Sequence, residues 1–362
     1  MAAAAVLYLA AVCAGSGDLR SAAAAVENSG VARQLLRWEL GQATLDRLPL
    51  AALVTLRQSP QLLSAGDDLR SSGADEVPQP SPAPDSRTDG GEPSPAPAPG
   101  GETSSPPLSV VVTDENGYTR VGDVFIKNAS RQTLEGVSFD GTFAAALGDD
   151  APQVLILHSH GSECYTPAPG ADILYSGNHR STDSRYNVVA AGDVMAEELE
   201  KAGIPVLHDR TLYDYPSYSG AYDRSLAAIE TALTEYPSLR FILDVHRDAI
   251  EDAEGNEYKV LSETSQGSAA QLTLIVGSDG SGLPHPNWME NLRLAVALQN
   301  QIAGQEPTLM RPITVRNSRY NQFKTTGSLL VEVGTAGNSL EEAVNAARLF
   351  AAGFAETIQN KG

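Results

Sequence analysis

The chain has 362 residues and a formal net charge of -20 at pH 7, a composition that argues against a general binder of nucleic acid or of anionic lipid surfaces. Its length leaves room for two domains. Because the sequence has only 2 cysteines, Cys13 and Cys164, the fold must depend on a hydrophobic core rather than on a disulfide framework.

The chain opens with an apolar segment, residues 1–15, that carries no charge. It is shorter than the roughly 20 residues that a membrane-spanning helix needs, and no basic flank precedes it. We interpret it as a signal-type segment or as the remnant of a membrane anchor. The sequence therefore predicts a protein at the cell membrane, with its catalytic domain on the extracytoplasmic side.

Two further regions precede the expected catalytic domain. Residues 16–71 have apolar residues three and four positions apart and are predicted to be helical. Residues 72–107 are rich in Pro, Ser, Ala and Gly, a composition that buries too little apolar surface to fold. This segment is expected to be a disordered linker, and residues 108–362 are expected to form one catalytic domain.

The most informative stretch runs from Val154 to Tyr165 and reads V-L-I-L-H-S-H-G-S-E-C-Y. An apolar strand leads directly into His158, His160 and Glu163, so these polar groups should lie at the carboxyl end of that strand. Such a cluster suits a divalent metal, most simply zinc. Cys164 could instead act as a nucleophile beside a histidine, but hydrolytic metal chemistry fits the neighbouring residues better.

Two more strands end in the same way. Phe241–Asp248 (F-I-L-D-V-H-R-D) carries His246, and Leu329–Gly334 (L-L-V-E-V-G) carries Glu332 among apolar residues. A single buried histidine is more often structural, and a lone glutamate can face solvent at a sheet edge. Three such strand ends in one chain nevertheless favour one convergent site.

The remaining pattern alternates strands with helices. Short strands are expected at Leu108–Val112 and Asp123–Asn128, before the motif strand. Later strands are expected at Ile204–His208 and Leu272–Gly277, and helices from Asn187 to about Gly203, then at Ser225–Tyr236, Trp288–Ile302 and Leu340–Gln359. This alternation predicts an α/β fold, a mostly parallel sheet covered by helices on both faces, with the site at the carboxyl ends of the strands.

The expected site suits hydrolysis of an amide. Zinc lowers the pKa of a bound water and polarises a carbonyl, and a nearby carboxylate can move the protons. Glu332 emerges from an apolar strand, where desolvation should raise its pKa, as such a proton shuttle requires.

As a set, these motifs resemble the stage II sporulation protein P family. The matching segments are His158–Tyr165, Asn187-Val188, Asp214–Tyr218 (D-Y-P-S-Y), Asp244–Asp248 (D-V-H-R-D) and Leu330–Thr335 (L-V-E-V-G-T). The resemblance covers roughly Leu108 to Gly362. It implies an amidase-like fold, since the family is similar to the zinc-dependent N-acetylmuramoyl-L-alanine amidases.

The resemblance also implies a function. The family is associated with cleavage of peptidoglycan during forespore engulfment, both at the amide between N-acetylmuramic acid and L-alanine and in peptide cross-links. Its expected partners, besides peptidoglycan, are a lytic transglycosylase and a membrane protein, with no role for nucleic acid. Two alternatives stay open, a non-catalytic peptidoglycan-binding or assembly protein and a zinc carboxypeptidase of the cell envelope.

The resemblance assigns roles to individual residues. His160 corresponds to the first zinc ligand, His246 to the second and Glu332 to the catalytic carboxylate. Glu163 is the expected third ligand. His158 and Asp183 are the alternative metal ligands. Arg180 and Arg247 are expected to bind the substrate.

Overall fold

The computed structural model describes residues 106–168, 171, 179–251 and 257–360. These residues belong to one compact unit, Asp68–Gly362. The predicted leader (1–15), the helical region (16–71) and nearly all of the predicted linker (72–107) lie outside the described residues. Within the described part of the chain, no helix combines the length and the apolar character needed to cross a membrane.

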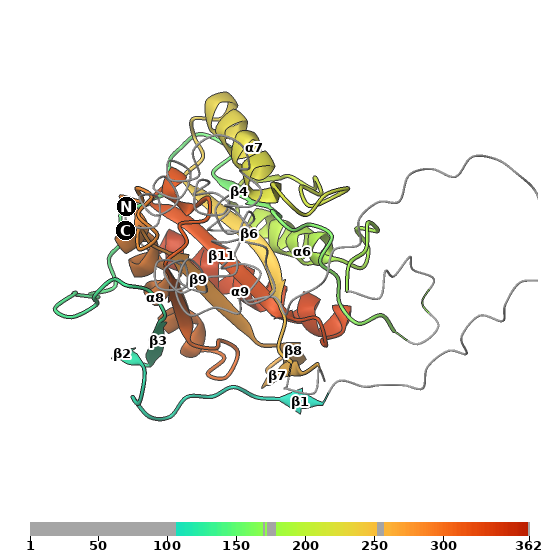
Figure 1. The fold of residues 1–362 in the computed structure, drawn as a ribbon, viewed down its shortest axis with the longest axis horizontal. Coiled ribbons are helices and arrows are strands. Elements are labelled where there is room, and N and C mark those ends of the chain that lie inside the picture. Colours follow the sequence, from blue (N-terminus) through green and yellow to red (C-terminus); the bar gives the residue numbers. More distant parts are fainter. Residues whose placement is uncertain (1–105, 169–170, 172–178, 252–256, 361–362) are drawn as a thin grey trace, which may run out of the picture. The chain divides into compact units, whose positions relative to one another are not determined.

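An eight-stranded sheet forms the centre of this unit, in the order β2-β3-β10-β9-β11-β6-β4-β5 (Figure 1). Its strands are β2 (Thr119–Val121), β3 (Val124–Asn128), β4 (Val154–Leu157), β5 (Val206–His208), β6 (Phe241–Asp248), β9 (Leu272–Gly277), β10 (Ile313–Arg316) and β11 (Gly327–Thr335). All neighbours pair in parallel except β2 with β3 and β9 with β11. The prediction of a mostly parallel sheet is confirmed, but β9 marks a reversal of strand direction.

A smaller sheet has the order β1-β7-β8. Its strands are β1 (Pro107–Leu108), β7 (Lys259–Thr264) and β8 (Gly267–Ala270). The strand predicted at Leu108–Val112 is wrong beyond Leu108. Instead, the backbone N–H of Val110 donates to the side-chain oxygen of Gln271 at 2.7 Å. A side chain thus accepts the hydrogen bond that the backbone carbonyl of a neighbouring strand would accept in a sheet.

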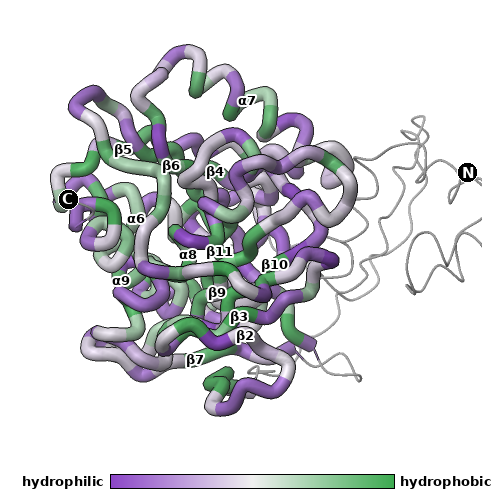
Figure 2. Tube along the Cα trace, turned by 90° about the vertical axis from the view of Figure 1, so that its left-hand side faces the viewer, coloured by the Kyte–Doolittle hydropathy of each residue, from purple (hydrophilic) through white to green (hydrophobic). Residues whose placement is uncertain are grey.

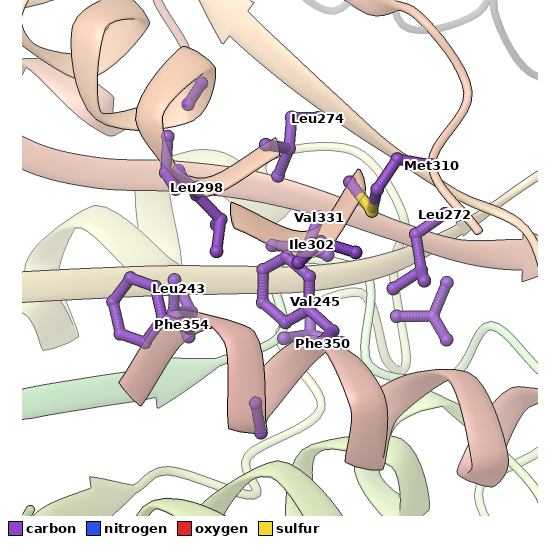
Figure 3. Close-up of a cluster of buried hydrophobic side chains, with 14 of the residues drawn as sticks. Leu243, Val245, Leu272, Leu274, Leu298, Ile302, Met310, Val331, Phe350 and Phe354 are labelled. Atoms are coloured by element: carbon purple, nitrogen blue, oxygen red, sulfur yellow. The ribbon is translucent and has the colours of Figure 1, made fainter. Parts of the chain in front are cut away.

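Three helices cover one face of the large sheet: α6 (Val188–Lys201), α8 (Trp288–Ala303) and α9 (Leu340–Gln359). Because strand side chains alternate between faces, Leu243, Val245 and Val331 point toward these helices and contact the core that contains Phe350 and Phe354 of α9 (Figure 3). Figure 2 shows the resulting distribution, with hydrophobic residues along β9 and β11 in the interior.

The helix ends follow the expected capping chemistry. Asn187 precedes α6, and its side chain accepts a hydrogen bond from the backbone N–H of Val189. Ser339 precedes α9 and forms a capping box with Glu342. These caps explain why the sequence located the starts of both helices.

On the opposite face of the sheet, the described residues include the helix α7 (Ala221–Glu235). Its residues Ile229 and Ala232 pack in a second cluster with Leu155 and Leu157 of β4 and Ile242 of β6. Helices therefore lie on both faces, as the sequence predicted. Since the strand residues of this cluster come from β4, β5 and β6, the same face of β11, β9 and β10 is left without a helix from the described residues.

Candidate metal centre

Three buried side chains converge at the carboxyl ends of β4 and β6. His160, Glu163 and His246 each offer one potential ligand atom, and these atoms lie within 4.8 Å of one another. His160 Nδ1 is 3.6 Å from Glu163 Oε1, and His246 Nδ1 is 3.4 Å from Glu163 Oε2. Imidazole nitrogens and a carboxylate form a donor set that zinc accepts.

The turn after β4 sets this geometry. The backbone N–H of Glu163 donates to the carbonyl of His160 at 3.1 Å, which closes the turn. Gly161 lies so close to Leu212 that an added Cβ would meet the Leu212 side chain at 2.8 Å. His246 reaches the same point because β6 is the parallel neighbour of β4.

Asp244 holds His246 from the side away from Glu163. It lies two residues earlier on β6, hence on the same face of the strand, and its Oδ1 is 2.9 Å from His246 Nε2. The backbone N–H and the hydroxyl of Ser159 donate to the two carboxylate oxygens of Asp244 at 2.8 and 2.7 Å. A carboxylate behind a histidine in this way fixes the ring orientation and increases its basicity toward a metal.

The charges at the cluster suit a cation. Burial lowers the pKa of His160 to about 3, so its ring is neutral and can act as a ligand. Burial opposes ionisation of Glu163, but His246 and Arg247 outweigh it and hold the pKa of the carboxyl below its usual range. Burial likewise opposes the charged form of His246, yet Asp244 and Glu163 raise its pKa well above the usual value. A metal must therefore displace a proton from His246, which makes binding dependent on pH.

Glu332 lies beside this cluster on β11, directly opposite His246 in the parallel register. Its Oε2 atom is buried and has no hydrogen-bond partner among the described residues. Burial, together with the nearby negative charge of Asp248, raises the pKa of Glu332 to about 8. The carboxyl can therefore hold a proton near neutral pH and release it readily.

A pocket connects these groups and has an aromatic wall. Its lining includes His160, Glu163, His246 and Glu332 together with three tyrosines, namely Tyr218, Tyr222 and Tyr320. The ring of Tyr218 stacks on His160 with a centroid distance of 4.5 Å. The pocket is thus lined by both polar and aromatic side chains, a combination that suits a substrate with both amide and apolar surfaces.

The two alternative ligands lie apart from the cluster. Because β4 ends at Leu157, the imidazoles of His158 and His160 make different contacts: His158 Nδ1 lies 2.9 Å from the carbonyl of Val245, and its Nε2 lies 2.9 Å from His208 Nε2. Asp183 makes a bidentate contact with the side chain of Arg185. Neither residue is among the three convergent side chains.

The two predicted substrate-binding arginines are engaged within the protein. Arg180 donates to Asp214 Oδ2 at 2.6 Å and lies 4.7 Å from the centre of the Tyr218 ring. Arg247 is buried and lines the pocket, but its Nε donates to the carbonyl of Cys164 at 3.2 Å. Both arginines support the loops around the cluster in this structure.

The thiol of Cys164 does not fit a nucleophile. The residue is fully buried, and burial raises its pKa to about 12, so the thiolate is disfavoured at neutral pH. This environment agrees with the preference for metal chemistry.

Sequence reasoning assigned no role to Asp244 or Asp214, although both belong to the quoted motifs. The signal for Asp244 was its spacing of two from His246 in an apolar strand, which places both on one face. Asp214 gives no comparable signal, because its partners Ser162 and Arg180 come from a turn and a distant loop.

Comparison with known proteins places the chain in a family. A family model described as "Stage II sporulation protein P (SpoIIP)" matches residues 108–355. The chain belongs to the stage II sporulation protein P family. It is 29% identical over 266 residues to the stage II sporulation protein P of Bacillus subtilis (strain 168), a match that covers 70% of this chain and 61% of that relative. The resemblance drawn from the motifs is thereby confirmed.

Solved structures with a similar arrangement include N-acetylmuramoyl-L-alanine amidases. The AmiC2 amidase of Nostoc punctiforme is 16% identical, with a TM-score of 0.33, and the match covers 59% of this chain and 98% of that one. The CwlD amidase of Clostridioides difficile, solved in complex with the GerS lipoprotein, is 15% identical, with a TM-score of 0.36 and coverage of 58% and 98%.

Proposed function

We propose that this member of the stage II sporulation protein P family is a zinc-dependent peptidoglycan hydrolase that cleaves the amide between N-acetylmuramic acid and L-alanine during spore engulfment. The observation that supports this most is the convergence of His160, Glu163 and His246 next to Glu332, whose Oε2 atom is buried and has no hydrogen-bond partner among the described residues. Membership of the family supplies the biological setting.

The three convergent residues would hold the zinc ion. When bound, zinc would supply an activated water and polarise the carbonyl of the scissile amide. Asp244 would hold the ring of His246 so that Nδ1 faces Glu163 and Nε2 faces Asp244. The buried surroundings strengthen each of these electrostatic interactions, because little water competes with them.

Glu332 would move the protons. As a carboxylate it can accept a proton from the attacking water, and as a carboxylic acid it can give that proton to the leaving amine. Its pKa of about 8 in this structure allows both states near neutral pH. The groups that would touch the substrate are therefore Glu332 and the pocket wall that contains Tyr218 and Tyr222.

We extend the proposal in three respects on the basis of family membership. The same site would also cut peptide cross-links, the protein would act at the cell membrane on its extracytoplasmic side, and it would work beside a lytic transglycosylase and a membrane protein.

Digestion of purified sacculi tests the reaction. Wild-type protein should release peptides that carry a new amino-terminal L-alanine, which mass spectrometry after amine labelling identifies. The Glu332→Gln variant should bind sacculi but lose release by about a hundredfold or more, because the proton shuttle is gone. Undiminished release by this variant would contradict the role of Glu332, and sacculus binding without any release by wild type would point to a non-catalytic binding protein.

A further inference from the structure

A second pocket adjoins the candidate metal centre. It shares Asp248, Tyr320 and Glu332 with the first pocket, so the two form one continuous groove. The far part of the groove is lined by side chains from β9, β10 and β3, including Thr273, Thr314, Arg316 and Lys127.

The sheet itself forms the floor of this groove. Leu274 and Val276 of β9 point into the core, so Thr273 and Ile275 occupy the opposite face. Across the sheet, Leu330 pairs with Ile275, Ile275 with Thr314 and Thr314 with Lys127. This row spans three strand spacings, about 14 Å, from the strand that carries Glu332.

The groove carries three basic side chains. Arg311 at its near end donates from Nη1 to Asp248 Oδ2 at 2.9 Å, and it is only 7% exposed. Its Nε and Nη2 atoms are buried and have no hydrogen-bond partner among the described residues. These two atoms form one edge of the guanidinium group, the edge that binds a carboxylate with two parallel hydrogen bonds.

Arg316 and Lys127 extend the positive charge toward the far end. In the part of the chain that the structure describes, neither forms an ion pair with an acidic residue, and the Nε atom of Arg316 is buried without a hydrogen-bond partner. Lys127 is exposed. The lining of the second pocket also contains the carboxyls of Asp248 and Glu332, so its three cations leave a small positive excess on a chain whose net charge is -20.

We propose that this groove binds the peptide portion of the substrate through its free carboxylates, with Arg311 at the near end and Arg316 and Lys127 at the far end. The inference rests on the proposed hydrolase function. The 14 Å row corresponds to about four residues of extended peptide, so the groove fits a stem tetrapeptide better than a dipeptide. The acyl side of the amide that is cut, which belongs to N-acetylmuramic acid, then lies over the pocket with the tyrosines. The amine side, which begins the peptide, lies over the sheet.

Binding of a reaction product tests the proposal without relying on catalysis. Isothermal titration with the free stem tetrapeptide should show binding about tenfold or more tighter than with the same peptide as its carboxamide. The Lys127→Gln/Arg316→Gln variant should lose that preference. The Arg348→Ala variant, changed on α9 where Arg348 lies near Glu198, should keep it.

The outcomes separate this proposal from the hydrolase function. Equal affinity of wild-type protein for the tetrapeptide and its carboxamide would overturn the groove assignment. Tighter binding of oligomeric glycerol phosphate than of the tetrapeptide would also overturn it, because the cations would then recognise a phosphate polymer. Sacculus digestion is measured in parallel: digestion without carboxylate preference removes the groove proposal alone, whereas preference without digestion removes the hydrolase proposal alone. Because Lys127 is exposed, the single variant Lys127→Gln tests the same preference if the double variant misfolds.

Discussion

Asp244 acts on the candidate metal centre through His246. It is buried, receives two hydrogen bonds from Ser159 and lies 2.9 Å from His246 Nε2. Although burial opposes its ionisation, His246 and Ser159 hold the pKa of Asp244 below its usual value. The carboxylate therefore stays charged beside Nε2 of His246, which leaves Nδ1 for a metal.

We predict that Asp244→Asn weakens zinc affinity by about 10–100-fold, because a neutral amide replaces the charged carboxylate that orients the ring of His246. Competition with a chelator measures the affinity. Asp183→Asn is the matched control, since Asp183 pairs with Arg185 away from the cluster, and it should leave the affinity unchanged. A loss of zinc in the control would instead make Asp183 a ligand.

Glu332 should leave a pH signature on the stability of the metal-free protein. Its pKa is raised from its usual 4.5 to about 8, so the folded state holds a proton that the unfolded state releases. The stability that this contributes is fully present below pH 4.5 and is lost as the pH rises through about 8. We therefore expect urea unfolding in the presence of a chelator to show that the free energy of unfolding falls between pH 5 and pH 8. This fall should be smaller for Glu332→Gln than for wild type. Equal losses would show that the carboxyl does not titrate in this way.

At the level of single residues, sequence reasoning reached the convergent groups but not their supports. His160, Glu163, His246 and Glu332 stand at the ends of apolar strands, where a polar residue is conspicuous. Arg311 gave no such signal, because it precedes the short strand β10, which the sequence pattern did not reveal. Its role depends on the sheet register, which only the fold specifies.

Among the elements, α6 is tied to the motif turn through Gly192. An added Cβ there would meet His158 Cε1 and Nε2 and His208 Nε2, each at 2.7 Å. These are ring atoms of two side chains held by their own contacts, so they have little room to move. The helix can approach β4 and β5 this closely only without a side chain at position 192.

We predict that Gly192→Ala destabilises the protein by about 1–3 kcal/mol through overpacking, although alanine is intrinsically the better helix former by about 1 kcal/mol. Urea unfolding measures the change. In a His208→Ala background the cost of Gly192→Ala should fall, because one of the two rings is gone. A stabilising Gly192→Ala would show that the contact is looser than the structure indicates.

The helices and the central strands were accessible from the sequence for a physical reason. The Leu340–Gln359 helix was predicted with the bounds it has, since a capping serine and a regular apolar face mark it. The antiparallel pairing of β9 with β11 was not predictable, because a short buried strand reads the same in both directions. The strands β7, β8 and β10 were missed for a different reason, because their short runs lack a continuous apolar pattern.

At the scale of the whole molecule, the reversal at β9 has a functional consequence. It places the amino-terminal ends of β9 and β10 at the edge where β4, β6 and β11 end. With α7 packed over β4, β5 and β6, the same face of β9, β10 and β3 lines a second pocket that extends the site into a groove. A substrate longer than the reacting amide thereby gains a surface along which to lie.

The most direct test of the metal-dependent hydrolase is zinc content measured together with release of stem peptides from purified peptidoglycan, for the full chain and for His246→Ala. We predict about one zinc per chain and clear hydrolysis in the wild type, with both lost in the variant. Wild-type protein that contains no zinc and binds sacculi without cutting them would contradict the proposal.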